Sequence, residues 1–469
     1  MLENKKKTSR EVDMTDGNIA RHLIKFAVPL LIGNLFQMMY NMVDTWVVGR
    51  FVSDAAFSAV GTLASVTNLM IGFFIGLSSG AGVVISRYFG AGRHDKVKET
   101  VNTSVIMTVV LCVSFTILGL AMIPLFMRIL DMPDDVRGEA VTYLSIWFSG
   151  ISGLMVYNIG SAIMRAVGDS RRPFIYLVVA AITNTVLDLL FVIVFKMGVA
   201  GVAIATIVAQ GLSAFLTVLS LCRTESCVKI SLKGLKFNWD IQREIIRVGI
   251  PAALQMAITA FSNMFVQSYI NFFGKECMGG WTAYSKIDQI ILLPMQSLSL
   301  ASTTFVGQNI GKEQVKRAEK GANTAFFISL VSTAVLIIPV MIFSGTFVKI
   351  FNTNDQIIEY GTLFLRWLTP FYLFWCVNQI YAGALRGVGN STAPMIIMLG
   401  SFVVFRQTYL FVVSKFISNT ILPIAMGFPA GWVLAAVITI IYYKKVGLKV
   451  PKKENGKKKP PQNNIALKQ

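Results

Sequence analysis

Charged residues are scarce in this chain. Only 14% of its 469 residues are charged and 54% are hydrophobic, whereas about a quarter of an ordinary soluble domain is charged. The high apolar content excludes intrinsic disorder, and five cysteines are too few for a secreted disulfide scaffold. The composition therefore predicts a polytopic membrane protein and argues against a soluble enzyme.

Potential metal ligands are also few and dispersed. The five cysteines form no Cys-x-x-Cys pair, and the only histidines are His22 and His94. Because zinc sites and thioredoxin-type redox sites need closely spaced ligands, we expect free thiols, no tightly bound metal and no cofactor.

Long apolar runs fill most of the chain. A bilayer core about 30 Å thick needs roughly 20 helical residues to cross it, and no run has the alternating pattern of a membrane β-barrel. The sequence predicts an all-α polytopic membrane protein with about twelve transmembrane helices. The runs lie near 24–48, 56–86, 101–126, 139–164, 173–195, 198–222, 245–272, 279–306, 321–346, 359–385, 393–414 and 420–443.

Lysine and arginine are unevenly distributed between the two sides of the predicted membrane. Most lie on the side that holds both ends of the chain, including segment 223–247 and the tail after 444. This excess is typical of cytoplasmic loops, so we expect a multi-pass protein of the cell membrane with both termini in the cytoplasm. It also explains the net charge of +19 with a lipid bilayer as partner and no nucleic acid.

The chain contains an internal repeat. Segments 165–173 and 386–394 share the pattern Arg-x-Val-Gly-x-Ser-x-x-Pro at an offset of 221 residues, and Pro29 and Pro251 repeat at 222. Repeats in one orientation imply two bundles related by a pseudo-two-fold axis along the membrane normal, which is typical of transporters. We expect a cytoplasmic tail (1–23), a first six-helix bundle (24–222), a cytoplasmic linker (223–244), a second six-helix bundle (245–443) and a basic cytoplasmic tail (444–469).

Acidic residues inside the apolar runs are candidates for function, because a charge at mid-membrane costs at least a few kcal/mol. Asp44 lies deep in the first run, and Asn184 and Asp188 lie four residues apart in the fifth, on one helix face. Thr206 lies in the sixth run. Two carboxylates, an amide and a hydroxyl could hold a proton or a transient sodium ion. Alternatively, each aspartate only braces a neighbouring helix.

The second half has polar side chains, but neither its seventh nor its tenth run has an acid in the middle of the run. Lys286 and Asp288 in the eighth run and Arg406 in the eleventh could line a cavity, pair across helices or brace the fold. Methionines of the first run suit an adaptable binding wall, although packing against lipid is the commoner role of such residues. The candidate substrate-cavity residues are Met38, Asn41, Met42, Gln210, Asn263, Gln267, Lys286, Asp288, Asn378, Gln379 and Arg406.

One enzyme motif matches by letter. Gly76-Leu-Ser78-Ser-Gly80 fits the Gly-x-Ser-x-Gly pattern of hydrolases, but it lies inside an apolar run. His94 is about 24 Å from Ser78 along a helix, so no catalytic pair forms. Gly72, Gly76 and Gly80 instead predict close helix packing, and we expect no enzyme activity.

Together these motifs resemble the multidrug and toxic compound extrusion (MATE) family. The resemblance rests on Tyr-Asn-Met-Val-Asp-Thr at 40–45, the glycine turn at 90–92 and the repeated segments 165–173 and 386–394, and it covers roughly 20–445. It implies twelve helices in two bundles around a central cavity. It also implies cation-driven export of amphipathic, often cationic, compounds by alternating access.

The resemblance is to the DinF-type branch of that family. It implies a cation or proton site at the matching positions Asp44, Asn184, Asp188 and Thr206. The NorM-type acids of the seventh and tenth helices are missing, so a second-bundle sodium site is not expected.

We therefore expect an antiporter that works as a monomer and exchanges small amphipathic molecules for protons or sodium. The alternative is a flippase for lipid-linked saccharides or cell-wall precursors. A flippase for anionic phosphates should have more buried basic residues than this chain offers.

Overall fold

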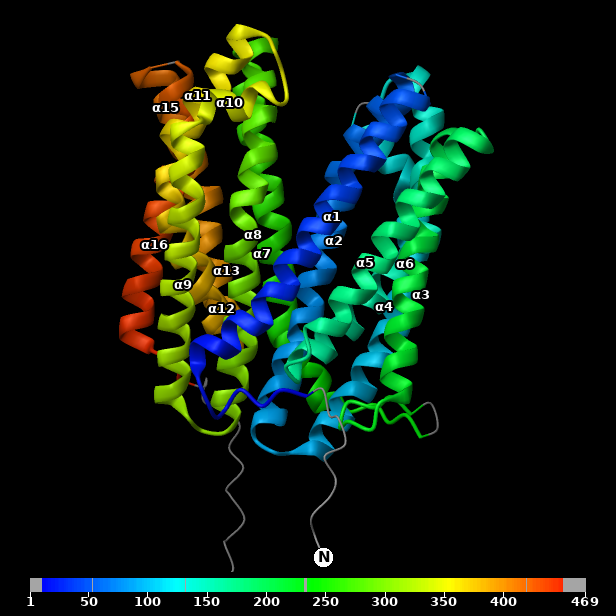
Figure 1. Ribbon diagram of the computed structural model, residues 1–469, viewed down its shortest axis with the longest axis vertical. Helices are drawn as coiled ribbons and strands as arrows, with labels where there is room; N and C mark the ends of the chain where they lie inside the picture. The colour runs from blue at the N-terminus through cyan, green and yellow to red at the C-terminus, as the bar shows by residue number, and fades with distance from the viewer. Residues whose placement is uncertain (1–10, 53, 131, 232–233, 419, 450–469) are drawn as a thin grey trace, which may run out of the picture.

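Helices account for nearly all of the structure, a computed structural model that describes residues 11–449 apart from positions 53, 131, 232–233 and 419; these residues include no strand (Figure 1). The first half comprises α1 (Ile19–Phe51), α2 (Asp54–Gly90), α3 (His94–Ile129), α4 (Asp134–Ala166), α5 (Arg171–Asp188) and α6 (Gly198–Arg223). The second half comprises α7 (Trp239–Asn271), α8 (Lys275–Gly311), α9 (Val315–Ile342), α10 (Ser344–Lys349), α11 (Asp355–Leu368), α12 (Tyr372–Gly387), α13 (Thr392–Met398), α14 (Arg406–Val412), α15 (Ile421–Ala425) and α16 (Gly427–Val446).

Eleven helical segments of the described chain are long and apolar enough to cross a membrane. The predicted run 359–385 is the exception, because a 3₁₀ turn at Thr369–Phe371 divides it into α11 and α12. Pro370 lies in this turn, where it has no N–H to donate and clashes with the preceding helical turn. The two pieces together supply the twelfth crossing of the predicted fold.

The helices form two bundles, α1–α6 and α7–α16 (Figure 1). Each bundle has its own buried core, with Trp147 and Phe148 in the first and Phe364 and Tyr372 in the second. The backbone repeats as the sequence predicts. Two pairs of residues separated by 221 positions have positive φ angles: Gly92 (67°) with Glu313 (62°), and Gly168 (84°) with Gly389 (91°).

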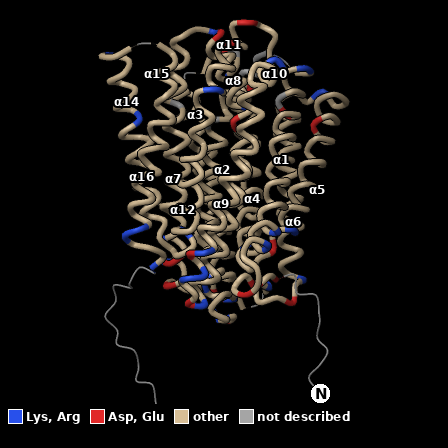
Figure 2. The backbone as a smooth tube through the Cα atoms, turned by 60° about the vertical axis from the view of Figure 1, so that its left-hand side comes forward, with Lys and Arg blue, Asp and Glu red and all other residues tan. Residues whose placement is uncertain are grey.

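Both ends of the described chain lie at one face of the molecule, which we call the terminus face (Figure 1). The bundles approach each other there and lean apart toward the opposite face (Figure 1). Figure 2 shows charged residues gathered at the two ends of the helices, with most lysines and arginines at the terminus face. This distribution fits an apolar belt between two aqueous surfaces.

Close contact between the bundles depends on the glycines of α2. A Cβ at Gly76 would lie 2.4 Å from the Cα of Ala253 in α7, and one at Gly80 would lie 2.5 Å from the carbonyl oxygen of Ile245. The helix packing predicted from the small residues at 72, 76 and 80 is therefore confirmed, and it joins α2 to α7.

Helix α1 contacts both bundles. Near the terminus face, Phe26 is buried against Phe305 of α8 in the second bundle. Toward the opposite face, Val47 is buried with Val202 of α6 in the first bundle. Pro29 lies between these two regions, and proline removes a backbone hydrogen bond from a helix. α1 therefore connects the two bundles through a locally weakened turn.

Replacement of Gly76 by alanine should lower stability. The added methyl group forces α2 and α7 apart, at about 1–3 kcal/mol. Gly61→Ala is a matched control, because a Cβ there meets no atom within 4 Å and alanine stabilises a helix by roughly 0.5–1 kcal/mol relative to glycine. Thermal unfolding in detergent should show a lower midpoint for Gly76→Ala alone. Equal midpoints would contradict the close α2–α7 contact.

Candidate ion-binding site in the first bundle

Two carboxyl groups meet inside the first bundle. Asp188 ends the regular part of α5, is fully buried, and precedes a π-helical turn at Leu189–Val194. Asp44 projects from α1 and is half-buried. The two carboxyl groups interact directly. Within the described chain, no side chain or backbone group donates a hydrogen bond to either oxygen of Asp188 or to Oδ1 of Asp44.

The amide of Asn184 is also without a hydrogen-bond partner. Its Nδ2 and Oδ1 are both buried and unpaired within the described chain, and the side chain is only 2% exposed. The hydrogen bond to Asp188 that the four-residue spacing allows is not formed. Because nearly all buried polar groups in proteins have a partner, this set of atoms points to a proton, ion or water that completes the site.

Thr206 belongs to α6, which packs against α5. Its hydroxyl donates to the carbonyl oxygen of Val202, 3.0 Å away, so it cannot also donate to a carboxylate. The hydroxyl oxygen keeps its lone pairs and can still act as an acceptor or cation ligand. Asp188 is thus brought to Asp44, and Asn184 lies one helical turn before Asp188 on α5. Among the described residues, no hydrogen bond joins Thr206 to the carboxyl pair.

Two tyrosines near the carboxyl pair were missed by the sequence analysis. Tyr40 of α1 and Tyr143 of α4 both interact electrostatically with Asp44 and Asp188. The position of Tyr40, one helical turn before Asp44, was a usable signal. No local pattern connects Tyr143 with the site, because it approaches from another helix.

The second bundle has one acid with tyrosine partners. The hydroxyl of Tyr372 in α12 donates to Oδ1 of Asp288, and the Tyr284 and Tyr372 hydroxyls are 2.8 Å apart. Lys286 makes no ion pair with Asp288 within the described chain. Asp288 was a candidate from the sequence, but its tyrosine partners were not predicted. Tyr284, one helical turn before Asp288 on α8, was a usable signal, whereas Tyr372 is distant in sequence.

Arg406 makes hydrogen bonds and ring contacts within the second bundle. Its guanidinium donates to Asn263 Oδ1 (3.2 Å), Ser262 Oγ (3.1 Å) and the Phe402 carbonyl oxygen (3.1 Å). It also lies over the rings of Phe402 and Phe428, at 5.2 and 4.7 Å. With 2% of its surface exposed, Arg406 braces the second bundle, as one of the sequence alternatives allowed.

The other cavity candidates are dispersed. Asn378 is buried and joins α12 to α16, because its Nδ2 donates to the Trp432 carbonyl oxygen (3.1 Å) and its Oδ1 accepts from Thr439 (3.3 Å). Gln267 donates to Asn271 at 2.8 Å on an exposed surface. Met42 and Asn41 are exposed, whereas Met38, Gln210, Lys286 and Gln379 are half-buried.

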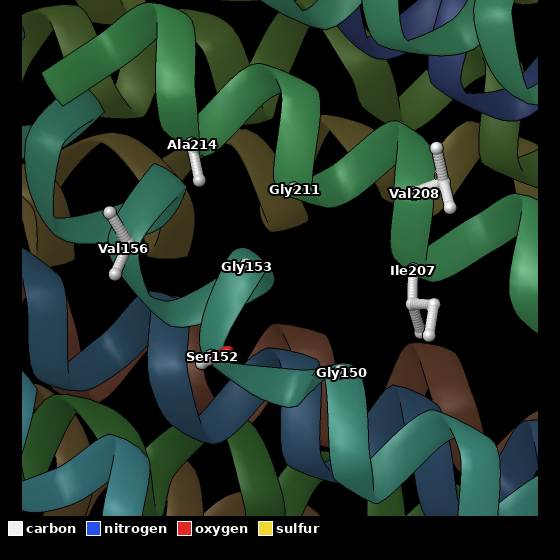
Figure 3. A pocket seen from close by; sticks show the side chains of 8 residues that line it. All are labelled: Gly150, Ser152, Gly153, Val156, Ile207, Val208, Gly211 and Ala214. Atoms are coloured by element: carbon white, nitrogen blue, oxygen red, sulfur yellow. The ribbon is translucent and has the colours of Figure 1, made fainter. Parts of the chain in front are cut away.

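A cavity of about 380 Å³ lies between α4 and α6, and the carboxyl pair is not among its lining residues. Figure 3 shows the residues that line it, which include Gly150, Gly153, Gly211, Ile207 and other small or aliphatic residues. No titratable side chain lines it. It is therefore an apolar groove and not part of the candidate ion site.

The fold and the site define a class: a helical, multi-pass membrane protein of transporter architecture, with an acidic site inside one of two repeated bundles. The MatE family model matches residues 29–190 and again residues 251–410, one match in each half. The chain belongs to the MATE family and has a transporter role.

Relatives cover nearly the whole chain. The "Probable multidrug resistance protein YpnP" of Bacillus subtilis is 30% identical over 92% of this chain and 96% of its own length. A protein described as an FAD transporter of Shewanella oneidensis is 24% identical over 81% of this chain and 85% of its own. The fold matches the outward-facing structure of a MATE multidrug resistance transporter with a TM-score of 0.88, at 22% identity over 94% of this chain and 98% of that one.

Loss of the Arg406 guanidinium should destabilise the second bundle. Arg406→Gln leaves buried acceptors unpaired, which costs roughly 1–3 kcal/mol. Arg137→Gln is the control, because that side chain is 54% exposed and 4.0 Å from Asp134, and an exposed pair contributes about 0–1 kcal/mol. Thermal unfolding in detergent should show a lower midpoint only for Arg406→Gln. An unchanged midpoint would contradict the structural role.

Proposed function

We propose that this chain is a DinF-type antiporter that exports amphipathic cations in exchange for protons or sodium ions. The observation that carries the proposal is the direct approach of Asp44 and Asp188, beside the unpaired amide of Asn184. Such a site binds the coupling ion, and the fold supplies the alternating access.

Ion binding is coupled to export through neutralisation of the carboxyl pair. Two adjacent carboxylates repel each other, and both lose hydration inside the bundle. A proton shared between Asp44 and Asp188 removes one negative charge. A sodium ion does the same, with the amide oxygen of Asn184 and the hydroxyl oxygen of Thr206 as further hard ligands.

Helix α1 connects this site to the movement of the bundles. It carries Asp44 in the part that packs on the first bundle, while its part before Pro29 packs on the second. An ion can shift a conformational equilibrium only if it binds the two states with different affinities. A change in the Asp44–Asp188 distance between states, transmitted through α1, provides that difference.

Cationic cargo fits the interior charges better than a phosphate-bearing lipid precursor. Among the described residues, Asp44, Asp188 and Asp288 have no basic partner within 4.0 Å. The guanidinium of Arg406 is already occupied by second-bundle groups. Because one relative is described as an FAD transporter, substrate assays should include this anionic compound as well.

The orientation follows from charge. We propose that the terminus face, which holds most lysines and arginines (Figure 2), lies in the cytoplasm of the cell. The bundles meet at this face and diverge at the other (Figure 1). The structure then represents the state in which the bundles are in contact on the cytoplasmic side and diverge toward the exterior.

Removal of the Asp188 charge should abolish coupling. Asp188→Asn keeps the shape of the side chain but binds neither a proton nor sodium in place of the carboxylate. Gradient-driven export should therefore fall about 5–150-fold, the range to which typical coupling free energies correspond. Asp44→Asn should act in the same direction. Asp134→Asn is the matched control, since that side chain is fully exposed at the opposite face.

The measurement is efflux of a cationic dye from everted vesicles, under pH and sodium gradients imposed separately and at matched expression. If Asp188→Asn depends on the gradients as strongly as the unaltered protein does, the proposed coupling site is refuted.

Topology can be tested independently. Epitope tags fused to each terminus should be inaccessible to antibody on intact cells and accessible after permeabilisation, because the basic excess lies on that side. Surface labelling of either tag on intact cells would overturn the proposed orientation.

A further inference from the structure

A short segment that precedes α1 lies across the terminus face. We call residues 11–18 the strap. The Val12 N–H donates to the carbonyl oxygen of Val167, at the end of α4, over 2.9 Å. The Glu11 carboxylate accepts from the hydroxyl of Ser226 and from the Cys227 thiol, whose sulfur is 3.6 Å away. This end of the strap is therefore attached to the first bundle and to the segment that follows it.

The half-buried Cys227 thiol is one of the donors in that attachment. Desolvation, with a further contribution from the charge of Glu11, raises the pKa of Cys227 to about 12. The thiol therefore stays protonated at physiological pH and remains a donor.

The middle of the strap is attached to the second bundle. The Met14 N–H donates to Oε1 of Gln308 over 2.9 Å, and the Met14 carbonyl oxygen accepts from Asn309 and Arg317, each at 3.3 Å. Arg317 also donates to the Gly17 carbonyl oxygen over 2.9 Å. The Met14 side chain is 1% exposed, in a cluster with α8 residues. This contact is largely dry, so its hydrogen bonds cannot be replaced by water while it is closed.

Lys312 adds a charged contact at the edge of the strap. Its ammonium group lies 2.8 Å from the Thr15 hydroxyl and 2.9 Å from the Asp16 carboxylate. Hydrogen bonding to Lys312 lowers the pKa of Asp16. Because this pair is exposed to solvent, it contributes less than the buried Met14 contacts.

Gln308 joins the two bundles directly. While its Oε1 accepts from the strap, its Nε2 donates to the carbonyl oxygen of Ala166 over 3.0 Å. The side chain is fully buried. A Cβ at Gly90 would lie 1.9 Å from the Gln308 carbonyl oxygen, so the two bundles touch at this point. Any separation of the bundles at the terminus face must break the Gln308–Ala166 bond.

We propose that the strap and Gln308 form a latch that holds the bundles together at the terminus face and must release before cargo can enter from that side. The proposal rests on the alternating access described above. Rocking apart would break either the Val12–Val167 and Glu11 contacts or the Met14–Gln308 contacts. The latch therefore stabilises the state that is open at the opposite face.

The test uses a thiol reporter at the closed contact. Ser86 of α2 is 1% exposed, and its hydroxyl would lie 2.1 Å from a Cβ at Gly307 of α8. In full-length protein without native cysteines, in which Cys227→Ser retains the donor to Glu11, Ser86→Cys is labelled with an impermeant maleimide from the terminus side of everted vesicles.

The latch-weakening variant is Lys312→Gln with Arg317→Gln. Loss of these charged donors should shift the equilibrium between closed and separated bundles at the terminus face toward the separated state. The Ser86→Cys labelling rate should rise about tenfold, which corresponds to about 1.4 kcal/mol. Gln308→Ala should act in the same direction. The matched control is Lys316→Gln with Lys320→Gln, which removes the same charge from exposed positions in the first turns of α9, beside Arg317.

Three outcomes would overturn the latch: an unchanged labelling rate, an equal rise in the matched control, or a parallel rise at Ser104→Cys. Ser104 is fully buried within α3 of the first bundle, so its labelling reports unfolding rather than opening. Because labelling needs neither substrate nor gradient, failure of the latch is distinguishable from failure of the Asp44–Asp188 coupling site.

Discussion

Two carboxyl groups that share one site inside a membrane protein impose the main constraint on this structure. Asp188 is fully buried and out of reach of bulk water, and an isolated charge at that depth costs several kcal/mol. The carboxyl pair is therefore stable only with a proton or cation, or in a conformation that admits water. A protein that alternates between two such states can convert ion binding into movement.

Helix α1 links the carboxyl pair mechanically to both bundles. One helix carries Asp44 within the first bundle and packs its beginning on the second, with Pro29 between the two regions. The strap continues directly into this helix, because Asn18 caps it by accepting from the Arg21 N–H at 3.0 Å. Contacts at the terminus face and at the carboxyl pair thus act on one continuous element.

Much of the architecture could be predicted from the sequence, because apolar length and repeated glycines are local signals. The 221-residue offset predicts the matched positive φ angles of Gly168 and Gly389. The break at Pro370 was missed, because a proline inside an apolar run is compatible with a kinked but continuous helix.

The candidate site was only partly predictable. Asp44, Asn184 and Asp188 could be found, because buried polar residues stand out against an apolar background. Tyr143 and the Tyr372–Asp288 bond could not, because residues from separate helices meet only after folding. Arg406 was found, and its spacing of four residues from Phe402 is a local signal. Its bracing role also depends on Asn263 and on the ring of Phe428, which come from other helices and whose proximity no spacing reveals.

The most direct test of the account is ion release on substrate binding. Purified protein in weakly buffered detergent solution receives a saturating cationic dye, while proton and sodium release are followed with ion-sensitive indicators. We expect release of one of the two ions in proportion to protein, and none from the double variant Asp44→Asn, Asp188→Asn. Substrate binding without release of either ion, or equal release from the double variant, would contradict the claim that this carboxyl pair couples ion binding to export.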